Sequence, residues 1–182
     1  MGLERGYVKG AAKASEGATL SAVAAPTPAV AALVRAGIDY RVHSYMHDPG
    51  IESYGQEAVD AMGIEASRVF KTLIASTGST LLVAVVPVPA MLDVKALASA
   101  VGAKRVDMAD PVAAERSTGY LVGAISPIGQ KRALTTVLDD SALEWDTIFC
   151  SAGRRGLELE LAPRALLDIT GGTAARVARI RT

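Results

Sequence analysis

The sequence predicts an α+β fold with a mixed, mostly antiparallel sheet that curls toward a barrel and is surrounded by short helices. Two observations favour this class. Segments of strand period and of helical period alternate irregularly along the chain, and several predicted strands are joined by short turns. A doubly wound parallel sheet would instead show a regular succession of strands and helices. The chain shows no internal repeat.

The 182 residues are enough for one domain with its own hydrophobic core. Residues 1–25 are rich in Ala, Gly and Ser and lack a sustained period, so they are expected to form a flexible extension before a domain at 26–182. The longest apolar run, residues 81–92, contains two prolines and is shorter than the roughly 20 residues that cross a bilayer. With no secretory signal and a single cysteine, a cytoplasmic protein without a membrane span is expected.

Helices are predicted where a capping residue precedes an apolar stripe of helical period that ends at a glycine. The clearest start is Thr27, with Pro28 at the first helical position. Asp110 and its following proline repeat this arrangement, and Ser53 and Gln56 have the spacing of a capping box. The predicted helices cover residues 27–37, 53–63, 93–101, 110–117 and 163–169.

Strands are predicted where β-branched and aromatic residues alternate with polar ones between turn residues. Residues 77–79 form the turn of one predicted hairpin, and the glycines and arginines at 153–156 form the turn of another. The predicted strands cover residues 38–45, 69–76, 81–86, 105–108, 120–122, 135–138, 147–152 and 157–161.

The charge of the chain gives no general affinity for nucleic acid, because 19 basic and 19 acidic side chains balance. Local basic groups could contact phosphates, although solvated surface charge is the simpler explanation for any one of them. These groups are Lys104-Arg105, Lys131-Arg132, Arg154-Arg155, and Arg176, Arg179 and Arg181.

Several chemistries are not indicated by any motif. The sequence has neither a G-x-x-x-x-G-K-[ST] nor a G-x-G-x-x-G loop, so nucleotide-binding folds and a cofactor are not expected. His43 and His47 are the only histidines, and a strand leading into a loop does not place them on one face, so no metal site is expected. Cys150 lies in an apolar run and is interpreted as a small buried residue, not as a nucleophile.

Lys71 stands out because it interrupts an apolar strand. It shares a strand face with Val69 and Leu73, so its ammonium must reach solvent, pair, or point into a polar pocket. The segment GAISPIG at 123–129 is a stiff loop whose backbone N–H groups could bind an oxyanion, or an ordinary turn between strands. Tyr45 and Tyr54 could wall a pocket or pack in the core.

These features resemble a known family. The segments VHSY at 42–45, HDP at 47–49 and FKTL at 70–73 are similar to the opening third of YbaK-type Cys-tRNA(Pro) deacylases. The segments MADP at 108–111, RSTGYLVG at 116–123 and ISPIGQK at 125–131 resemble the central signature of that family, and residues 151–157 resemble its closing strand and turn. The resemblance covers about residues 26–180.

The resemblance implies the fold of the editing domain that is inserted in some prolyl-tRNA synthetases. It implies that Lys71 and Gly123 are catalytic. It implies further that the substrate is bound by the following residues: Tyr45, Tyr54, Ala124, Ile125, Ser126, Pro127 and Ser151. The family usually has two glycines where this chain has Gly123 and Ala124, so an extra methyl group could change how closely the loop approaches the substrate.

The implied function is trans-editing, the hydrolysis of mischarged Cys-tRNA(Pro), with mischarged tRNA and prolyl-tRNA synthetase as partners and no cofactor. A prolyl site cannot reject smaller amino acids strongly, so a second hydrolytic sieve is useful. An aminoacyl ester is already activated, and the thiol of a cysteinyl substrate could itself attack the carbonyl. Two alternatives remain: an Ala-tRNA(Pro) deacylase, and a non-catalytic module that binds tRNA or the synthetase.

Overall fold

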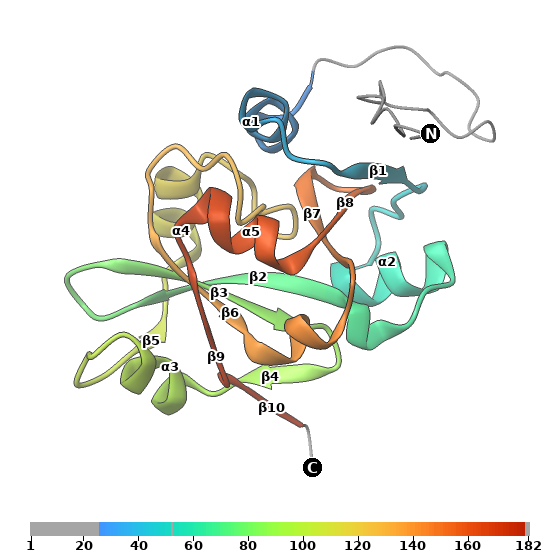
Figure 1. Ribbon diagram of the computed structural model, residues 1–182. Coiled ribbons are helices and arrows are strands. Elements are labelled where there is room, and N and C mark those ends of the chain that lie inside the picture. Colours follow the sequence, from blue (N-terminus) through green and yellow to red (C-terminus); the bar gives the residue numbers. More distant parts are fainter. Residues whose placement is uncertain (1–25, 52, 181–182) are drawn as a thin grey trace, which may run out of the picture.

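The computed structural model describes residues 26–51 and 53–180, and the extension expected at residues 1–25 lies outside them (Figure 1). Eight strands form one sheet in the order β1-β8-β7-β2-β3-β6-β9, with β5 paired to β2. A second sheet consists of β4 and β10. The strands of the large sheet are β1 (Arg41–Ser44), β2 (Val69–Ser76), β3 (Leu81–Pro87), β5 (Asp107–Met108), β6 (Thr135–Asp139), β7 (Ile148–Arg154), β8 (Leu157–Leu161) and β9 (Thr173–Ala175), and those of the small sheet are β4 (Ala90–Leu92) and β10 (Ala178–Ile180).

The large sheet is mixed, as the sequence predicts. The pairs β1–β8, β7–β8, β2–β3 and β2–β5 are antiparallel, whereas β2–β7, β3–β6 and β6–β9 are parallel. Within the described part of the chain, the outer strands β1 and β9 do not pair with each other, so the sheet stays open and does not close into a barrel.

Among the described residues, five α-helices surround the sheet, and two of them begin at the predicted capping residues. The Thr27 hydroxyl accepts a hydrogen bond from the Val30 N–H (3.2 Å), and Asp110 caps its helix at the Ala113 N–H (2.9 Å). The capping box predicted at Ser53 is wrong, because Ser53 makes no capping hydrogen bond and Gln56 bonds to Asp60 instead. The helices are α1 (Pro28–Ala36), α2 (Tyr54–Met62), α3 (Val94–Ala100), α4 (Pro111–Thr118) and α5 (Pro163–Thr170).

The strand predicted at residues 120–122 is absent, and this segment begins a long loop over residues 119–134. Tyr120 is buried, and its hydroxyl donates to the Ile128 carbonyl (2.8 Å), so an aromatic residue that resembles a strand residue is in fact a loop anchor. The strand predicted from residue 38 starts only at Arg41, where pairing with β8 begins. The sequence did not reveal the three-residue strands β4, β9 and β10.

The two faces of the large sheet pack against different helices, as Figure 1 shows for α3 on one side and α4 and α5 on the other. Phe70 and Ile74 of β2 belong to the main core together with Leu33 of α1 and Leu166 of α5. Alternate residues of β2 face the opposite way, and Ala75 packs with α3. Within the described residues, no helix is long and apolar enough to cross a membrane.

Gly129 fixes the 119–134 loop against the first turn of α1. Its φ is +69°, and a Cβ at this position would lie 2.5 Å from the Pro28 carbonyl carbon. Only glycine allows both this backbone conformation and this close approach. The loop that carries Gly123 is therefore held at its far end by contact with a helix.

We expect Gly129→Ala to lower the free energy of unfolding more than Gly37→Ala does. Both glycines have positive φ, which costs an L-residue about 1–2 kcal/mol. A Cβ at Gly37 would meet nothing within 4 Å, whereas one at Gly129 would clash with backbone and should cost about 1 kcal/mol more. Urea unfolding of both variants measures the difference, and equal losses would contradict the close approach.

Candidate active site

Strand β2 has a neighbour along all of one edge and along only part of the other. On one edge, β3 pairs with residues 70–76. On the opposite edge, β7 pairs with residues 69–70 and β5 pairs with residues 75–76. The edge is therefore split, and residues 71–73 lie in a gap between the ends of two neighbouring strands.

Thr72 directs its main-chain groups into this gap. The Val69 carbonyl bonds to the Val88 N–H on the β3 side (2.8 Å), and the Ile74 carbonyl accepts from the Ala109 N–H on the other side (3.0 Å). Because antiparallel pairing alternates along a strand, the N–H and C=O of Thr72 face the gap, where no described residue pairs with them. Its hydroxyl oxygen is also buried without a partner among the described residues.

A pocket of ≈ 440 Å³ lies at the gap, within the range of about 300–1,000 Å³ that is usual for small-molecule sites. The consecutive residues 69–74 of β2 all line the pocket, so it follows the stretch of the strand at the gap. The pocket brings together the following residues that the sequence singles out: Tyr54, Lys71, Gly123, Ile125 and Ser151.

Lys71 is held by the turn between β3 and β4. Its Nζ donates to the carbonyl oxygens of Val88 (3.0 Å) and Ala90 (2.7 Å). Lys71 is half-buried, and these two bonds partly compensate the desolvation of its ammonium and fix its position beside the turn. The sequence allowed this ammonium to reach solvent, pair, or point into a polar pocket, and the structure shows it bonded to two carbonyl oxygens in a residue that lines the pocket.

The 121–125 segment brings backbone donors to the same pocket. Gly123 and Ile125 line it, and neither of their N–H groups donates to a described residue. The Ala124 N–H is used within the turn, since it donates to the Leu121 carbonyl (2.9 Å). Unpaired backbone amides are the kind of donor that stabilises a developing oxyanion.

Four residues expected to bind substrate do not line the pocket. Ala124, Ser126 and Pro127 are buried behind its wall, and the Ser126 hydroxyl accepts a hydrogen bond from the Ile128 N–H (3.3 Å). Tyr45 packs with the Val69 cluster at α2. Burial, followed by the charges of nearby Glu158 and Glu57, raises the pKa of Tyr45 to about 12, so its hydroxyl stays protonated at neutral pH.

Glu158 is a pocket residue that the sequence analysis missed. It lies opposite Ser151 in the β7–β8 pairing and lines the pocket, and only 8% of the residue is exposed. No described residue donates a hydrogen bond to its carboxyl group. Burial raises the pKa of Glu158 to about 8, so the carboxyl group is mainly neutral at pH 7. A desolvated carboxyl group in a pocket is characteristic of binding and catalytic sites.

The remaining nucleophile and metal candidates do not form a site. Cys150 is fully buried, which raises the pKa of its thiol and confirms that it is a core residue. His43 and His47 bond to different carboxylates, Glu160 (2.9 Å) and Glu57 (2.8 Å). Among the residues that the structure describes, no three His, Cys, Asp or Glu side chains gather to hold a metal ion.

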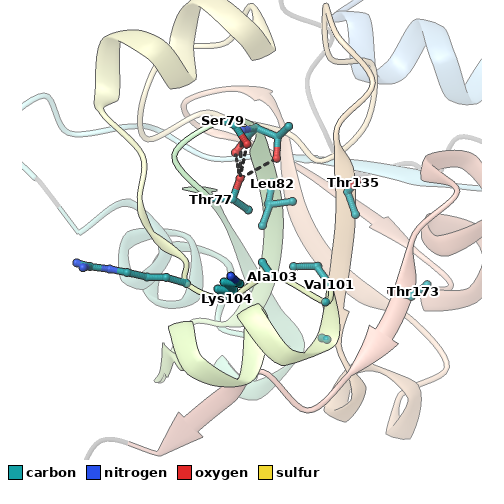
Figure 2. A pocket seen from close by; sticks show the side chains of 12 residues that line it. Thr77, Ser79, Leu82, Val101, Ala103, Lys104, Thr135 and Thr173 are labelled. Atoms are coloured by element: carbon teal, nitrogen blue, oxygen red, sulfur yellow. Dashed lines mark hydrogen bonds between the residues drawn. The ribbon is translucent and has the colours of Figure 1, made fainter.

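A second hollow, of ≈ 560 Å³, lies at the other end of the β2–β3 hairpin (Figure 2). Its wall carries Thr77, Ser79 and Lys104, and it shares no residue with the pocket at the gap. Arg105, the neighbour of Lys104, pairs with Asp107 (2.8 Å), which reduces the local positive charge. This hollow contains none of the site residues expected from the sequence.

Comparison with known proteins finds related sequences. The sequence model of a family described as the aminoacyl-tRNA editing domain matches residues 48–169. A protein of Enterococcus faecalis (strain ATCC 700802 / V583), EbsC, is named as a proposed Cys-tRNA(Pro)/Cys-tRNA(Cys) deacylase. It is 42% identical over 123 residues, or 67% of this chain and 75% of that protein. The uncharacterized protein YwhH of Bacillus subtilis (strain 168) is 27% identical over 116 residues, which cover 63% of this chain and 73% of YwhH.

Solved structures share the fold. The crystal structure of the hypothetical protein APE2540 matches with a TM-score of 0.72 and 26% identity, over 81% of this chain and 96% of that chain. That of a proposed trans-editing enzyme for prolyl-tRNA synthetase also matches with a TM-score of 0.72, at 23% identity over 82% and 93% of the two chains. The fold expected from the sequence is thereby confirmed. With the family match across two thirds of its length, the chain belongs to the aminoacyl-tRNA editing domain family.

Proposed function

We propose that this protein hydrolyses the ester bond of mischarged aminoacyl-tRNA, and that Cys-tRNA(Pro) is its main substrate. The observation that supports this most directly is the pocket at the gap in β2. Its lining includes Lys71, two residues whose backbone amides are unpaired among the described residues, and the buried carboxyl residue Glu158. The name of the E. faecalis relative supports the choice of substrate.

The donor set suits acyl transfer at an activated ester. When a nucleophile attacks the ester carbonyl, the oxygen gains negative charge, and preorganised donors lower the free energy of that state. The N–H groups of Gly123 and Ile125 and the positive charge of Lys71 serve this purpose. Because the ester is activated, positioning and charge stabilisation are sufficient, and no protein nucleophile is required.

Glu158 binds the α-ammonium group of the aminoacyl ester. In an aminoacyl ester, the positively charged nitrogen lies two bonds from the carbonyl carbon that is attacked. A pocket that binds the ester therefore needs a hydrogen-bond acceptor close to the reacting carbonyl group. Glu158 is the buried carboxyl group of the pocket, and it has no hydrogen-bond donor among the described residues. An ammonium ligand favours the ionised carboxylate and so reverses the pKa rise that burial causes.

The nucleophile comes from the substrate or from water. Cys150 is buried, and the Ser151 hydroxyl accepts a hydrogen bond from the Gly153 N–H (3.3 Å). In Cys-tRNA(Pro), the thiolate attacks the carbonyl carbon, the bond to the ribose oxygen breaks, and that oxygen takes a proton. The product is a cyclic thioester, which water opens to cysteine. An alanyl ester has no thiol and would depend on water alone.

This activity defines the partners. The mischarged tRNA is the substrate, and prolyl-tRNA synthetase, which produces the error, is the expected protein partner. Since aminoacyl-tRNAs are made in the cytoplasm, the protein acts there.

We expect the purified protein to deacylate Cys-tRNA(Pro) faster than Ala-tRNA(Pro) and to leave Pro-tRNA(Pro) largely intact. The thiol gives the cysteinyl ester a nucleophile, and the pocket excludes the prolyl ring, a discrimination worth about 10–200-fold. Single-turnover rates on the three esters measure this order. Equal cysteinyl and prolyl rates would contradict editing, and a faster alanyl ester would assign the protein to alanyl editing.

Lys71→Ala should reduce the single-turnover deacylation rate by about 100-fold or more, the usual effect of removing an oxyanion-stabilising group. Lys71→Arg should also be slow, because a planar guanidinium cannot make the same bonds to the Val88 and Ala90 carbonyls. Lys95→Ala, on the exposed side of α3, is the control for loss of a positive charge. A near-normal rate in Lys71→Ala, with an unchanged thermal midpoint, would exclude Lys71 from the reaction.

Glu158→Gln should become increasingly more stable than the wild type as pH rises from 5.5 to 7.5. The folded-state pKa, about 8, is above the unfolded value of about 4.3, so the folded protein holds a proton that the unfolded chain releases. Wild-type stability therefore falls with pH in this window, by up to about 1.4 kcal/mol per pH unit, and the neutral amide removes that loss. Thermal midpoints at several pH values measure the difference.

The exposed Glu144→Gln variant should show no such trend. The binding role of Glu158 has a separate test, N-acetylation of the cysteinyl ester, which removes the ammonium charge. Acetylation should slow the wild type much more than Glu158→Gln, and an equal effect on both proteins would rule out the ammonium contact.

A further inference from the structure

The ring of Tyr54 forms a wall of the pocket, and three separate segments contact it. Gly123 lies directly against the ring, because a Cβ at that position would be 2.4 Å from the Tyr54 Cε2. His47 approaches the ring with 5.8 Å between ring centroids. The Arg155 guanidinium lies over the ring, with its Cζ 4.7 Å from the centroid.

The local structure of α2 does not fix Tyr54 by itself. Tyr54 is the first residue of the helix, and Ser53 before it makes no side-chain capping bond. An uncapped helix start has unpaired N–H groups and tends to fray. The position of the tyrosine ring therefore depends on its tertiary contacts.

Arg155 joins two sides of the pocket. Its guanidinium lies over Tyr54 of α2 and also donates to the carbonyl oxygen of Val122 (3.0 Å), which precedes Gly123 in the pocket loop. A planar guanidinium can stack on a ring and donate within its plane at the same time, whereas a lysine ammonium cannot. The neighbouring Arg154 is exposed and makes neither contact.

We propose that Arg155 is a positioning residue that fixes Tyr54 against Gly123 and thereby sets the size limit for the amino acid in the pocket. This inference rests on the proposed function. Both arginines of the basic pair Arg154-Arg155 are exposed. In this view Arg155 shapes the pocket, whereas Arg154 makes neither contact and can bind tRNA phosphates. Without Arg155, the ring can move away from Gly123, and the pocket admits the prolyl ring.

The test is the ratio of single-turnover rates on Cys-tRNA(Pro) and Pro-tRNA(Pro), measured for the wild type, Arg155→Ala, Arg155→Lys and Arg154→Ala. The ratio does not depend on the fraction of active protein, so a partly unfolded variant does not distort it. We expect this rate ratio to fall about tenfold in Arg155→Ala, which is the usual loss of discrimination when one packing group is removed from a binding pocket. The ratio should also fall in Arg155→Lys. Arg154→Ala should keep the wild-type ratio.

Two other outcomes would contradict the positioning role of Arg155, and a third would contradict the proposed function. If Arg155→Ala slows both esters by the same factor and Arg155→Lys restores both rates, Arg155 binds phosphate and the positioning role is overturned. A wild-type ratio in Arg155→Ala overturns it as well. If the wild type cleaves no mischarged tRNA, the proposed function itself fails, a result that is distinct from an active enzyme with an unchanged ratio.

Discussion

The pocket exists because strand β2 lacks a neighbour along the middle of one edge. Two local features stop the flanking strands. Continuing the β5 pairing would place Pro111 opposite Thr72, and proline has no N–H to give while Asp110 already starts α4. On the other side, β7 leaves β2 after Cys150 and bulges against β8 between Ser151 and Arg154. The gap is thus built from a helix cap and a bulge.

The sequence predicted those parts of the fold whose signals are local. Thr27 and Asp110, each followed by proline, specified two helix starts correctly, and the hairpin turn at 77–79 specified β2 and β3. The sequence-based prediction was wrong where tertiary contacts determine the local structure. Tyr120 resembles a strand residue, but its environment is a loop that packs on the core. The parallel β2–β7 pairing, which defines one side of the gap, joins segments about 80 residues apart. No local sequence pattern in either segment indicates this pairing.

The site was predictable to the extent that a residue conflicted with its own surroundings. Lys71 could be identified because an ammonium group in an apolar strand needs polar partners. In the structure these partners are the carbonyl oxygens of Val88 and Ala90. Glu158 was not noticeable, since the alternation LELEL at 157–161 is typical of a strand with one solvent-facing side. That side is covered in the structure, where Glu158 is buried and Glu160 is bonded to His43 and Thr147. Only the tertiary packing shows which of two similar glutamates faces a pocket.

The residues of the proposed site are held in place in two different ways. Lys71, Ser151 and Glu158 lie on paired strands, whose hydrogen bonds hold their backbone in place. Gly123 lies in a loop and Tyr54 begins an uncapped helix, so both need contacts from elsewhere, which Gly129 and Arg155 supply. Weakening the Arg155 contact with the Tyr54 ring should therefore change which ester the pocket accepts. Weakening the support of the loop should also slow cleavage, because the Gly123 N–H is a proposed oxyanion donor. Variation in this family should accordingly alter specificity more easily at the supporting contacts than on the strands.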